Sequence, residues 1–224
     1  MEKLKEAVGK QAAELVKDGM TIGLGTGSTA YYMIISLGER VKEGLNISCV
    51  ATSLASEKTA IEVGLTMIDF KDIETIDITI DGADEIDPDM NLIKGGGGAL
   101  LREKIIENFS KKLIIIADES KKVDWLGDFK VPVEVVTFAR ELTQKEIMKI
   151  GGHPVLRKKG DDVFTTDNGN FIFDCDFGKI KDPSGLCAKL NMIPGVVENG
   201  IFPNMADLAL IAMKNGEIEL IERD

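Results

Sequence analysis

The stretch from Asp81 to Glu103 constrains the fold more than any other, because it packs acids, one lysine and four consecutive glycines into a single connection. Before it, apolar and polar residues alternate over residues 76–80, which predicts a buried strand that ends at the first acid. After it, apolar side chains recur at helical spacing at Leu101, Ile105 and Phe109. The glycines therefore open a helix, where they let backbone amides approach a ligand. We expect carboxylates, an ammonium and free amides to converge on one pocket.

Predicted strands and helices alternate along the chain as far as residue 121. The helices are expected at residues 2–17, 31–37 and 56–63, and the strands at residues 20–24, 47–51 and 113–117. Such alternation is typical of an α/β fold, in which helices cover both faces of a parallel sheet. Ligands of such sheets lie outside the carboxyl ends of the strands.

The pattern changes near Gly127, where we place a domain boundary. Residues 129–136 predict a strand whose Pro132 suits a sheet edge, and Thr143-Gln-Lys-Glu146 predicts a capping-box start to a helix that ends at Gly151. Further short strands at residues 155–158, 163–166 and 170–175 and a helix at residues 183–190 complete a smaller α+β unit. Residues 208–213 and 218–220 then flank Asn215-Gly216, a strong hairpin signal.

The composition limits the partners of the chain. A net charge of −11 over 224 residues argues against nucleic acids and anionic membrane surfaces as main partners. The longest apolar runs are far too short to span a bilayer, and the first residues lack the apolar region of a signal peptide, so we expect a cytoplasmic protein. The three widely spaced cysteines suggest neither a disulfide framework nor a zinc site.

Gly25-Thr-Gly-Ser-Thr-Ala30 matches the Gly-x-Gly-x-x-Ala fingerprint of dinucleotide-binding folds, between a strand and a helix. That fingerprint also needs an acid at the end of the second strand to hold a ribose, and Thr52-Ser53 stand there instead. A pocket rich in hydroxyls and poor in acids favours a phosphate monoester over a dinucleotide, with a purely structural turn as the other alternative. No Gly-Lys-Ser/Thr follows, so the motif is not a nucleotide P-loop.

The acidic residues of the central stretch divide into two groups. Asp87-x-Asp89-x-Asn91 begins like a calcium-binding loop, but Leu92 and Gly98 occupy positions that need a glycine and a glutamate. A solvated turn is the better interpretation, and we expect no metal site. Asp81 and Asp84 lie nearer the strand end and are the better site candidates.

The remaining titratable groups are a lysine, a glutamate and a histidine. Lys94 precedes the four glycines, so its ammonium and the following amides can face one anion. Glu103 stands between Arg102 and Lys104, and by sequence alone a solvent-facing helical acid is the favoured interpretation. His153 lies in Gly-Gly-His-Pro, which predicts a loop, so acid–base chemistry falls to carboxylates and lysines.

Five motifs follow one another along the chain, namely Gly25-Thr-Gly-Ser-Thr-Ala30, Asp81-Gly-Ala-Asp-Glu-Ile-Asp87, Lys94-Gly-Gly-Gly-Gly-Ala-Leu-Leu-Arg-Glu-Lys104, Ala117-Asp-Glu-Ser-Lys121 and Pro194-Gly-Val-Val-Glu-Asn-Gly-Ile-Phe202. Together they resemble ribose-5-phosphate isomerase, type A, in the order of that family and over nearly the whole chain. The departures lie outside the motifs: the segment before Pro194 is short, and Pro203-Asn-Met-Ala-Asp207 is one version of a variable stretch.

The resemblance implies a Rossmann-like, mostly parallel sheet in residues 1–127 and 203–224, with a smaller α+β domain in residues 128–202. It also implies a homodimer or a dimer of dimers. The activity that it implies interconverts D-ribose 5-phosphate and D-ribulose 5-phosphate, in the non-oxidative branch of the pentose phosphate pathway. The reaction passes through an enediolate, and the family uses no metal and no other cofactor.

Roles for the motif residues follow from the same resemblance. Glu103 is implied as the base, and Lys94 with the amides of Gly95, Gly96 and Gly97 as the group that stabilises the enediolate oxygen. Asp81 and Asp84 are implied to handle hydroxyl protons and help to open the furanose ring. The other residues implied to bind substrate are Thr26, Gly27, Ser28, Thr29, Gly82, Ala83 and Lys121.

Two alternatives stay open. Glucosamine-6-phosphate deaminases and CoA transferases have a similar fold, but they lack the Asp-Gly-Ala-Asp to Lys-Gly-Gly-Gly arrangement of this chain. A non-enzymatic sugar-phosphate sensor would keep the phosphate-binding turn and would have no use for Glu103.

Overall fold

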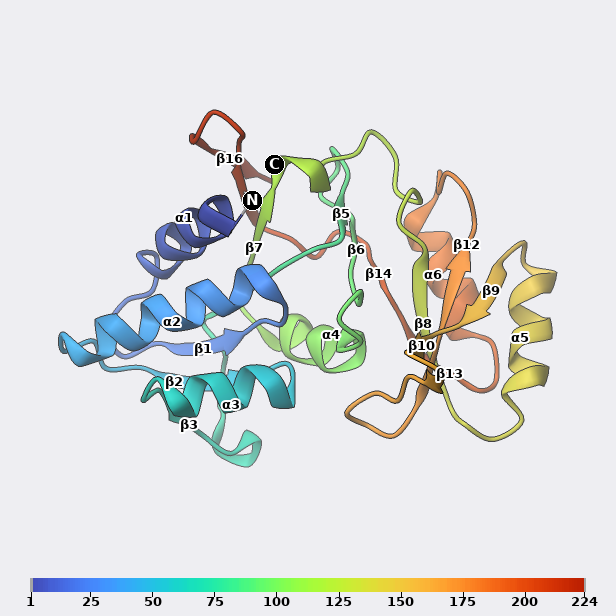
Figure 1. Cartoon of the computed structure of the whole chain (residues 1–224), viewed down its shortest axis with the longest axis horizontal. Coiled ribbons are helices and arrows are strands. Elements are labelled where there is room, and N and C mark those ends of the chain that lie inside the picture. Colours follow the sequence, from blue (N-terminus) through green and yellow to red (C-terminus); the bar gives the residue numbers. More distant parts are fainter. Residues whose placement is uncertain (1, 224) are drawn as a thin grey trace. The chain divides into compact units, whose positions relative to one another are not determined.

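The computed structural model describes residues 2–223, so residues 1 and 224, the ends of the predicted first domain, lie outside it. The chain divides into two compact units (Figure 1). The first unit holds the described residues up to Ala83, then Arg102–Lys121 and those from Met205 onward; the second holds Asp84–Leu101 and Lys122–Asn204. The domain limits near residues 127 and 203 stay a prediction, and the compact units differ from them chiefly in grouping residues 84–101 with the second part.

The first unit is built on a seven-stranded sheet. Its order is β16-β15-β7-β4-β1-β2-β3, and only the β15–β16 pair is antiparallel. The strands are β1 (Thr21–Leu24), β2 (Ser48–Ala51), β3 (Thr66–Met67), β4 (Ile78–Asp81), β7 (Leu113–Asp118), β15 (Leu208–Ala212) and β16 (Ile218–Glu222). The predicted α/β fold with a mostly parallel sheet is confirmed, and so is the hairpin at Asn215-Gly216, whose glycine has φ of 90°.

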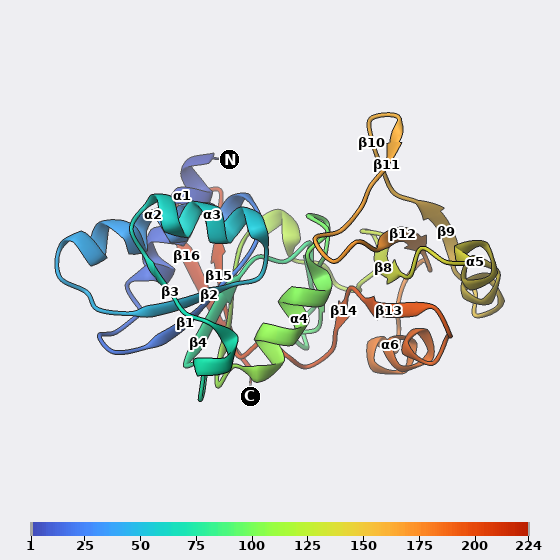
Figure 2. The same ribbon diagram turned by 90° about the horizontal axis from the view of Figure 1, so that it is seen from below.

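Helices cover both faces of this sheet (Figure 2). They are α1 (Glu2–Ala13), α2 (Ser28–Lys42), α3 (Leu54–Glu62) and α4 (Leu100–Phe109), with short 3-10 turns at η1 (Phe70–Asp72) and η2 (Glu119–Lys121). The sheet grows from β1 towards β3 through α2 and α3, and from β4 towards β7 through α4 in the opposite direction. Because such crossovers are right-handed, α4 lies on the other face from α2 and α3. The two cores agree: Met33 of α2 packs in one, and Ile106 of α4 packs with Val50 and Ile76 in the other.

The first helix is shorter than predicted. The apolar pattern predicts a helix over residues 2–17, but α1 ends at Ala13. The guanidinium of Arg40, on α2, donates to the backbone oxygen of Ala13 and to that of Val16, 2.9 Å away. These carbonyls therefore have a tertiary partner at the helix end, which local sequence does not reveal.

In α4, the helix that follows the glycines, two apolar side chains are exposed and two glutamates are buried. Ile105 and Phe109 are 60% and 55% exposed, whereas Glu103 and Glu107 are 4% and 3% exposed. The spacing therefore predicted the helix correctly, but the solvent-facing interpretation of Glu103 is wrong. Ile105 instead lines a groove of about 350 Å³ together with Val50, Ala51, Glu57, Met67, Ile68, Phe70, Arg102 and Ile106.

The second unit is α+β, as predicted. Its main sheet is antiparallel, with the order β13-β8-β12-β9. The elements are β8 (Val131–Val135), α5 (Arg140–Lys149), β9 (His153–Leu156), β10 (Lys158–Lys159), β11 (Asp162–Val163), β12 (Phe171–Asp176), α6 (Pro183–Asn191) and β13 (Val196–Asn199). Alternating valines of β8 and Phe173 of β12 form its core.

Several local predictions in this unit are wrong. His153, predicted to lie in a loop, is the first residue of β9, and the strand predicted at residues 163–166 is limited to Asp162–Val163. Pro132 does not lie on an edge strand, because β8 has β13 on one side and β12 on the other. The residue pairs between β8 and β13 extend only as far as Val133, so Pro132 lies just beyond them. The Pro132 carbonyl accepts the Gly200 amide at 2.7 Å. Thr143 does not cap a helix either: α5 begins at Arg140, and the buried Thr143 hydroxyl donates to the Pro194 carbonyl at 3.4 Å.

A third sheet takes two of its three strands from the turn-rich connection between Asp81 and Glu103. It consists of β5 (Glu85–Ile86), β6 (Leu92–Ile93) and β14 (Ile201–Phe202), in the order β14-β6-β5. Between β5 and β6, the carboxylate of Asp87 accepts the amides of Asp89 and Asn91 at 3.0 and 2.8 Å. This turn, in which a side chain bonds its own backbone, is the predicted solvated turn.

Within residues 2–223, no helix is both long enough and apolar enough to cross a membrane. All three cysteines are free thiols, as the sequence predicted. Cys49 and Cys175 are fully buried, and burial raises the pKa of Cys49 to about 12 and raises the pKa of Cys175 as well. Such thiols stay protonated and unreactive near neutral pH.

Candidate functional site

In the first unit, Asp81 holds the turn between β1 and α2. This carboxylate is 1% exposed, and its Oδ1 accepts the amides of Thr26 and Gly82 at 2.8 and 2.6 Å. A Cβ on Gly25 would lie 2.2 Å from the same oxygen, so only glycine fits there. Asp81 thus joins the end of β4 to the glycine-rich turn after β1, which the sequence placed at the same sheet edge.

Hydroxyl groups support the same turn from β2 and α3. The Thr26 hydroxyl lies 2.7 Å from the Thr52 hydroxyl and donates to the Ser53 hydroxyl at 2.8 Å, and the Ser56 hydroxyl donates to the Gly25 carbonyl at 2.7 Å. Thr52, Ser53 and Ser56 are all buried. The hydroxyls that the sequence assigned to a pocket therefore stabilise the backbone of the turn.

The start of α2 is a cationic region. Gly27 precedes the helix with φ of 104°, and the residues of the turn are exposed at Gly27 and Ser28. Lys5, from α1, donates to the Ser28 hydroxyl at 2.8 Å. A helix N-terminus with its free amides and a nearby ammonium is a binding site for an anion such as phosphate. Sequence reasoning missed Lys5, because a lysine on an amphipathic helix carries no signal of a contact 23 residues away.

Lys121 lies in η2, just after β7, and Asp118 connects it to the same region. Burial raises the pKa of the Asp118 carboxyl, but hydrogen bonds from Ser120 and the charges of Lys121 and Lys5 outweigh it and hold the pKa below its usual value. Asp118 therefore stays ionised at neutral pH, and its carboxylate interacts electrostatically with both ammonium groups. Lys5 thus contacts Ser28 and, like Lys121, acts on the Asp118 carboxylate, so both lysines lie near the start of α2.

Glu103 is one of the buried acids of the first unit, at 4% exposed. It stands in the first turn of α4, where the partial positive charge of the helix N-terminus favours a carboxylate. A glutamate is seldom this buried unless it is paired. Its burial makes it a candidate for chemistry, whereas the sequence pattern alone favoured an ordinary surface position.

In the second unit, Lys94 follows β6 and is 1% exposed, which is unusual for a lysine. Its amide donates to the Gly200 carbonyl at 2.9 Å, and its ammonium lies 5.5 Å from the ring centroid of Phe202. A Cβ on Gly200 would lie 2.3 Å from the Lys94 carbonyl oxygen, so the two chain segments approach as closely as glycine permits. The motif at Pro194–Phe202 thus holds the lysine in place.

The glycine loop after Lys94 is shaped by Asp84. Gly95 and Gly98 have φ of 98° and 86°, which explains two of the four glycines. The amide of Gly96 donates to Asp84 Oδ2 at 2.7 Å. The backbone of Asp84 is itself fixed, because its N–H donates to the Ile93 carbonyl at 2.8 Å. Gly96 and Gly97 are exposed, so the loop presents backbone to a ligand.

The candidate residues fall into one set in each unit. The first unit holds Thr26, Gly27, Ser28, Thr29, Asp81, Gly82, Ala83, Glu103 and Lys121, and the second holds Asp84, Lys94, Gly95, Gly96 and Gly97. Within residues 2–223, no group of three or more His, Cys, Asp or Glu side chains could hold a metal ion. The groove beside Ile105 contains none of the candidate residues. The roles of these residues stay predictions.

Comparison with known proteins gives a consistent result. The family described as ribose 5-phosphate isomerase A (phosphoriboisomerase A) matches residues 48–216. The ribose-5-phosphate isomerase A of Bacillus mycoides (strain KBAB4) is 52% identical over 217 residues, covering 96% of this chain and 98% of that protein. The enzyme of that name from Nitrobacter hamburgensis is 46% identical over 230 residues, covering 100% and 99%.

Solved structures agree. The ribose 5-phosphate isomerase from Plasmodium falciparum has a TM-score of 0.97 at 40% identity, covering 100% of both chains. A D-ribose-5-phosphate isomerase in complex with phospho-erythronic acid has a TM-score of 0.95 at 41% identity, covering 99% of both chains. With the five sequence motifs and the parallel sheet that carries them, these matches show that the chain belongs to the ribose-5-phosphate isomerase A family.

Proposed function

We propose that this protein interconverts D-ribose 5-phosphate and D-ribulose 5-phosphate by proton transfer through an enediolate. The observation that carries the proposal is the fully buried Lys94, followed by a glycine loop with exposed backbone, in a chain of this family. A buried ammonium beside an exposed glycine loop is suited to an oxygen that becomes negative during a reaction. The same reaction places the protein in the non-oxidative branch of the pentose phosphate pathway.

The chemistry requires one base that reaches two adjacent carbons. An exchange of aldose and ketose moves a proton between C1 and C2, while the carbonyl oxygen gains negative charge. The Glu103 carboxylate takes the proton from C2 of the aldose and returns it to C1, so that the carboxylate is regenerated. Lys94 stabilises the enediolate oxygen together with the amides of Gly95 and Gly97, whereas the Gly96 amide donates to Asp84. No redox cofactor enters this balance, and we propose that none is used and that no metal is needed.

The two aspartates have supporting roles. Asp81 accepts backbone amides of the phosphate-side turn, and Asp84 accepts the Gly96 amide, so each fixes a backbone segment of its own unit. We propose that their carboxylates also exchange protons with the sugar hydroxyls and so help to open the furanose ring. Gly82 and Ala83, between them in the chain, bind substrate through the backbone.

Turnover of D-ribose 5-phosphate by the purified protein tests the proposal directly. The assay is run in EDTA and without nucleotide, and formation of ribulose 5-phosphate is expected. Glucosamine 6-phosphate serves as the control substrate, since ammonia release from it would indicate the deaminase activity of a related fold. Binding of ribose 5-phosphate without turnover would contradict the proposal and favour a sugar-phosphate sensor.

Phosphate binding by α2 leads to a prediction about KM. Ser28→Glu places a carboxylate where the phosphate is expected, and Lys5→Ala removes the ammonium that contacts Ser28 at 2.8 Å. We expect each to raise KM, Ser28→Glu by about tenfold or more and Lys5→Ala by a few-fold, with little change in kcat, since phosphate contacts are the same in ground and transition states. Steady-state kinetics measure both constants. Lys10→Ala, on the exposed side of α1, is the matched control.

Other properties rest on the family resemblance and on the composition of the chain. We propose a cytoplasmic homodimer or dimer of dimers that binds neither nucleic acid nor membranes. We also propose that phospho-erythronic acid binds this protein, because its planar, charged carboxylate resembles an enediolate. That acid shares its terminal phosphate with the substrate, so we expect the N-terminus of α2 to bind it as well.

A further inference from the structure

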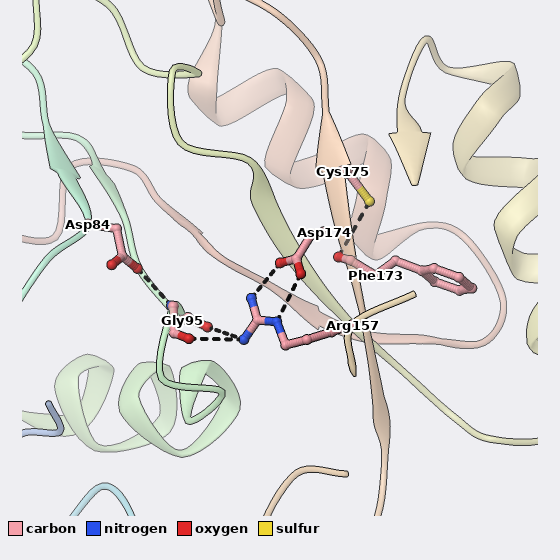
Figure 3. Close-up of polar contacts among 7 residues, drawn as sticks. Asp84, Gly95, Arg157, Phe173, Asp174 and Cys175 are labelled. Carbon is pink, nitrogen blue, oxygen red and sulfur yellow. Dashed lines mark hydrogen bonds and ion pairs between the residues drawn. The ribbon is translucent and has the colours of Figure 1, made fainter. Parts of the chain in front are cut away.

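Arg157 makes an unusual set of contacts in the second unit (Figure 3). It lies between β9 and β10, and its Nε and Nη2 donate to the two carboxylate oxygens of Asp174 on β12 at 3.0 and 2.5 Å. Its Nη1 donates to the carbonyls of Gly95 and Gly96 at 2.8 and 3.2 Å. One guanidinium therefore connects the antiparallel sheet to the glycine loop that follows Lys94.

The sheet side of this connection is rigid. The Arg157 amide donates to the Ile172 carbonyl at 2.8 Å, and Asp174 stands on a strand that is paired on both sides. The Arg157 side chain is only 12% exposed, and its guanidinium lies 5.7 Å from the ring centroid of Phe164. A bidentate arginine–carboxylate pair of low exposure holds a fixed orientation, which a lysine could not reproduce.

The contacts define the orientation of two peptide groups in the loop. In a trans peptide the carbonyl and the following N–H point in opposite directions. The peptide between Gly95 and Gly96 is held at both ends, because its carbonyl accepts from Arg157 and its N–H donates to Asp84. The peptide between Gly96 and Gly97 has its carbonyl on Arg157, so the Gly97 N–H must point away from Arg157.

We propose that Arg157, supported by Asp174, is a positioning residue that pre-organises the glycine loop for the enediolate oxygen. Glycines have the largest backbone freedom of any residue, so an unsupported run of four would lose much entropy when it forms an oxyanion site. Arg157 fixes the two carbonyls without touching substrate, and its charge polarises the same peptides, which makes their N–H groups better donors. The inference rests on the proposed isomerase function.

The test compares Arg157→Ala and Arg157→Lys with the wild type in steady-state kinetics. We expect kcat to fall about 10- to 100-fold in both, with KM for ribose 5-phosphate within about twofold, because a misplaced donor costs transition-state and not ground-state stabilisation. Added guanidinium or methylguanidinium should restore part of kcat to Arg157→Ala and none to Arg157→Lys. Arg140→Ala is the matched control: Arg140 lies in the same unit, pairs with Glu141 and stacks on Phe171, away from the loop.

A binding readout separates this inference from the proposed function. Calorimetric titration should show phospho-erythronic acid bound about tenfold or more weakly by Arg157→Ala, with inorganic phosphate bound as by the wild type. That result supports the positioning role whether or not the wild type turns over ribose 5-phosphate. Unchanged kcat and unchanged affinity for the acid in folded Arg157→Ala would overturn it, even if the melting temperature fell. If that variant fails to fold, Asp174→Asn is measured instead, and it should show the same kcat and affinity changes at smaller size.

Discussion

Replacing Glu103 with glutamine is expected to abolish turnover of ribose 5-phosphate and to leave its binding nearly unchanged. The amide keeps the shape of a side chain that is 4% exposed, so packing of α4 is preserved, but it cannot accept the proton from carbon. Phosphate and hydroxyl contacts come from other residues, so the dissociation constant should change by less than about threefold. The expected loss in kcat is about 10⁴-fold, the upper end of what a positioned acid–base group contributes.

Isotope exchange tests the same role in the wild-type enzyme. Product formed in D₂O should carry deuterium at the carbon that receives the proton, because a carboxyl proton exchanges at least partly with solvent. Glu103→Gln should lose turnover and exchange together. Glu107→Gln is the matched control, because Glu107 lies one turn further along α4 and is equally buried at 3%. Near-normal turnover by Glu103→Gln would move the base elsewhere, first to Asp81 or Asp84, and product without deuterium would indicate direct hydride transfer.

Removal of the Lys94 ammonium should have the second largest effect. We expect Lys94→Ala to lower kcat by about 100-fold or more with a much smaller rise in KM, because an oxyanion contact strengthens as charge develops in the transition state. The alanine also leaves a cavity, since the lysine is 1% exposed. Lys94→Met fills most of that space without the charge, so it separates the two effects.

The kinetic comparison of these variants is decisive for the role of Lys94. If charge matters, Lys94→Met and Lys94→Ala should lose similar amounts of kcat, while only the alanine variant loses substantial thermal stability. Recovery of kcat in Lys94→Met would show that packing near Phe202 accounts for the loss. A rise in KM alone would make Lys94 a ground-state phosphate ligand and would contradict the oxyanion role.

Local sequence was sufficient for most of the elements that carry the candidate residues. The alternation over residues 76–80 placed Asp81 at a strand end, and Gly25-Thr-Gly-Ser-Thr-Ala30 lies between a strand and a helix, as its pattern indicated. Period and turn chemistry are properties of neighbouring residues, so a single sequence contains them. The motifs also identified the family, which comparison with known proteins confirms.

Local sequence failed where a contact joins distant segments. The face of α4 is an example: Ile105 and Phe109 suggested an apolar buried side, yet Glu103 and Glu107 are the buried residues. A helical period states which residues share a face, but the rest of the fold decides where that face points. The limit of α1 depends in the same way on Arg40, which donates to the carbonyl of its last residue and to that of Val16.

The sequence by itself therefore determined the α/β class, the strand-end acids, the glycine turns and the family. Only the tertiary structure decided that β14 pairs with β6 beside Lys94, that Lys5 contacts Ser28, and that Arg157 holds the carbonyls of the glycine loop. The physical reason is that hydrogen bonds and ion pairs depend on distance and direction in space, and residues 62 positions apart in the chain, such as Gly95 and Arg157, meet only in the folded chain.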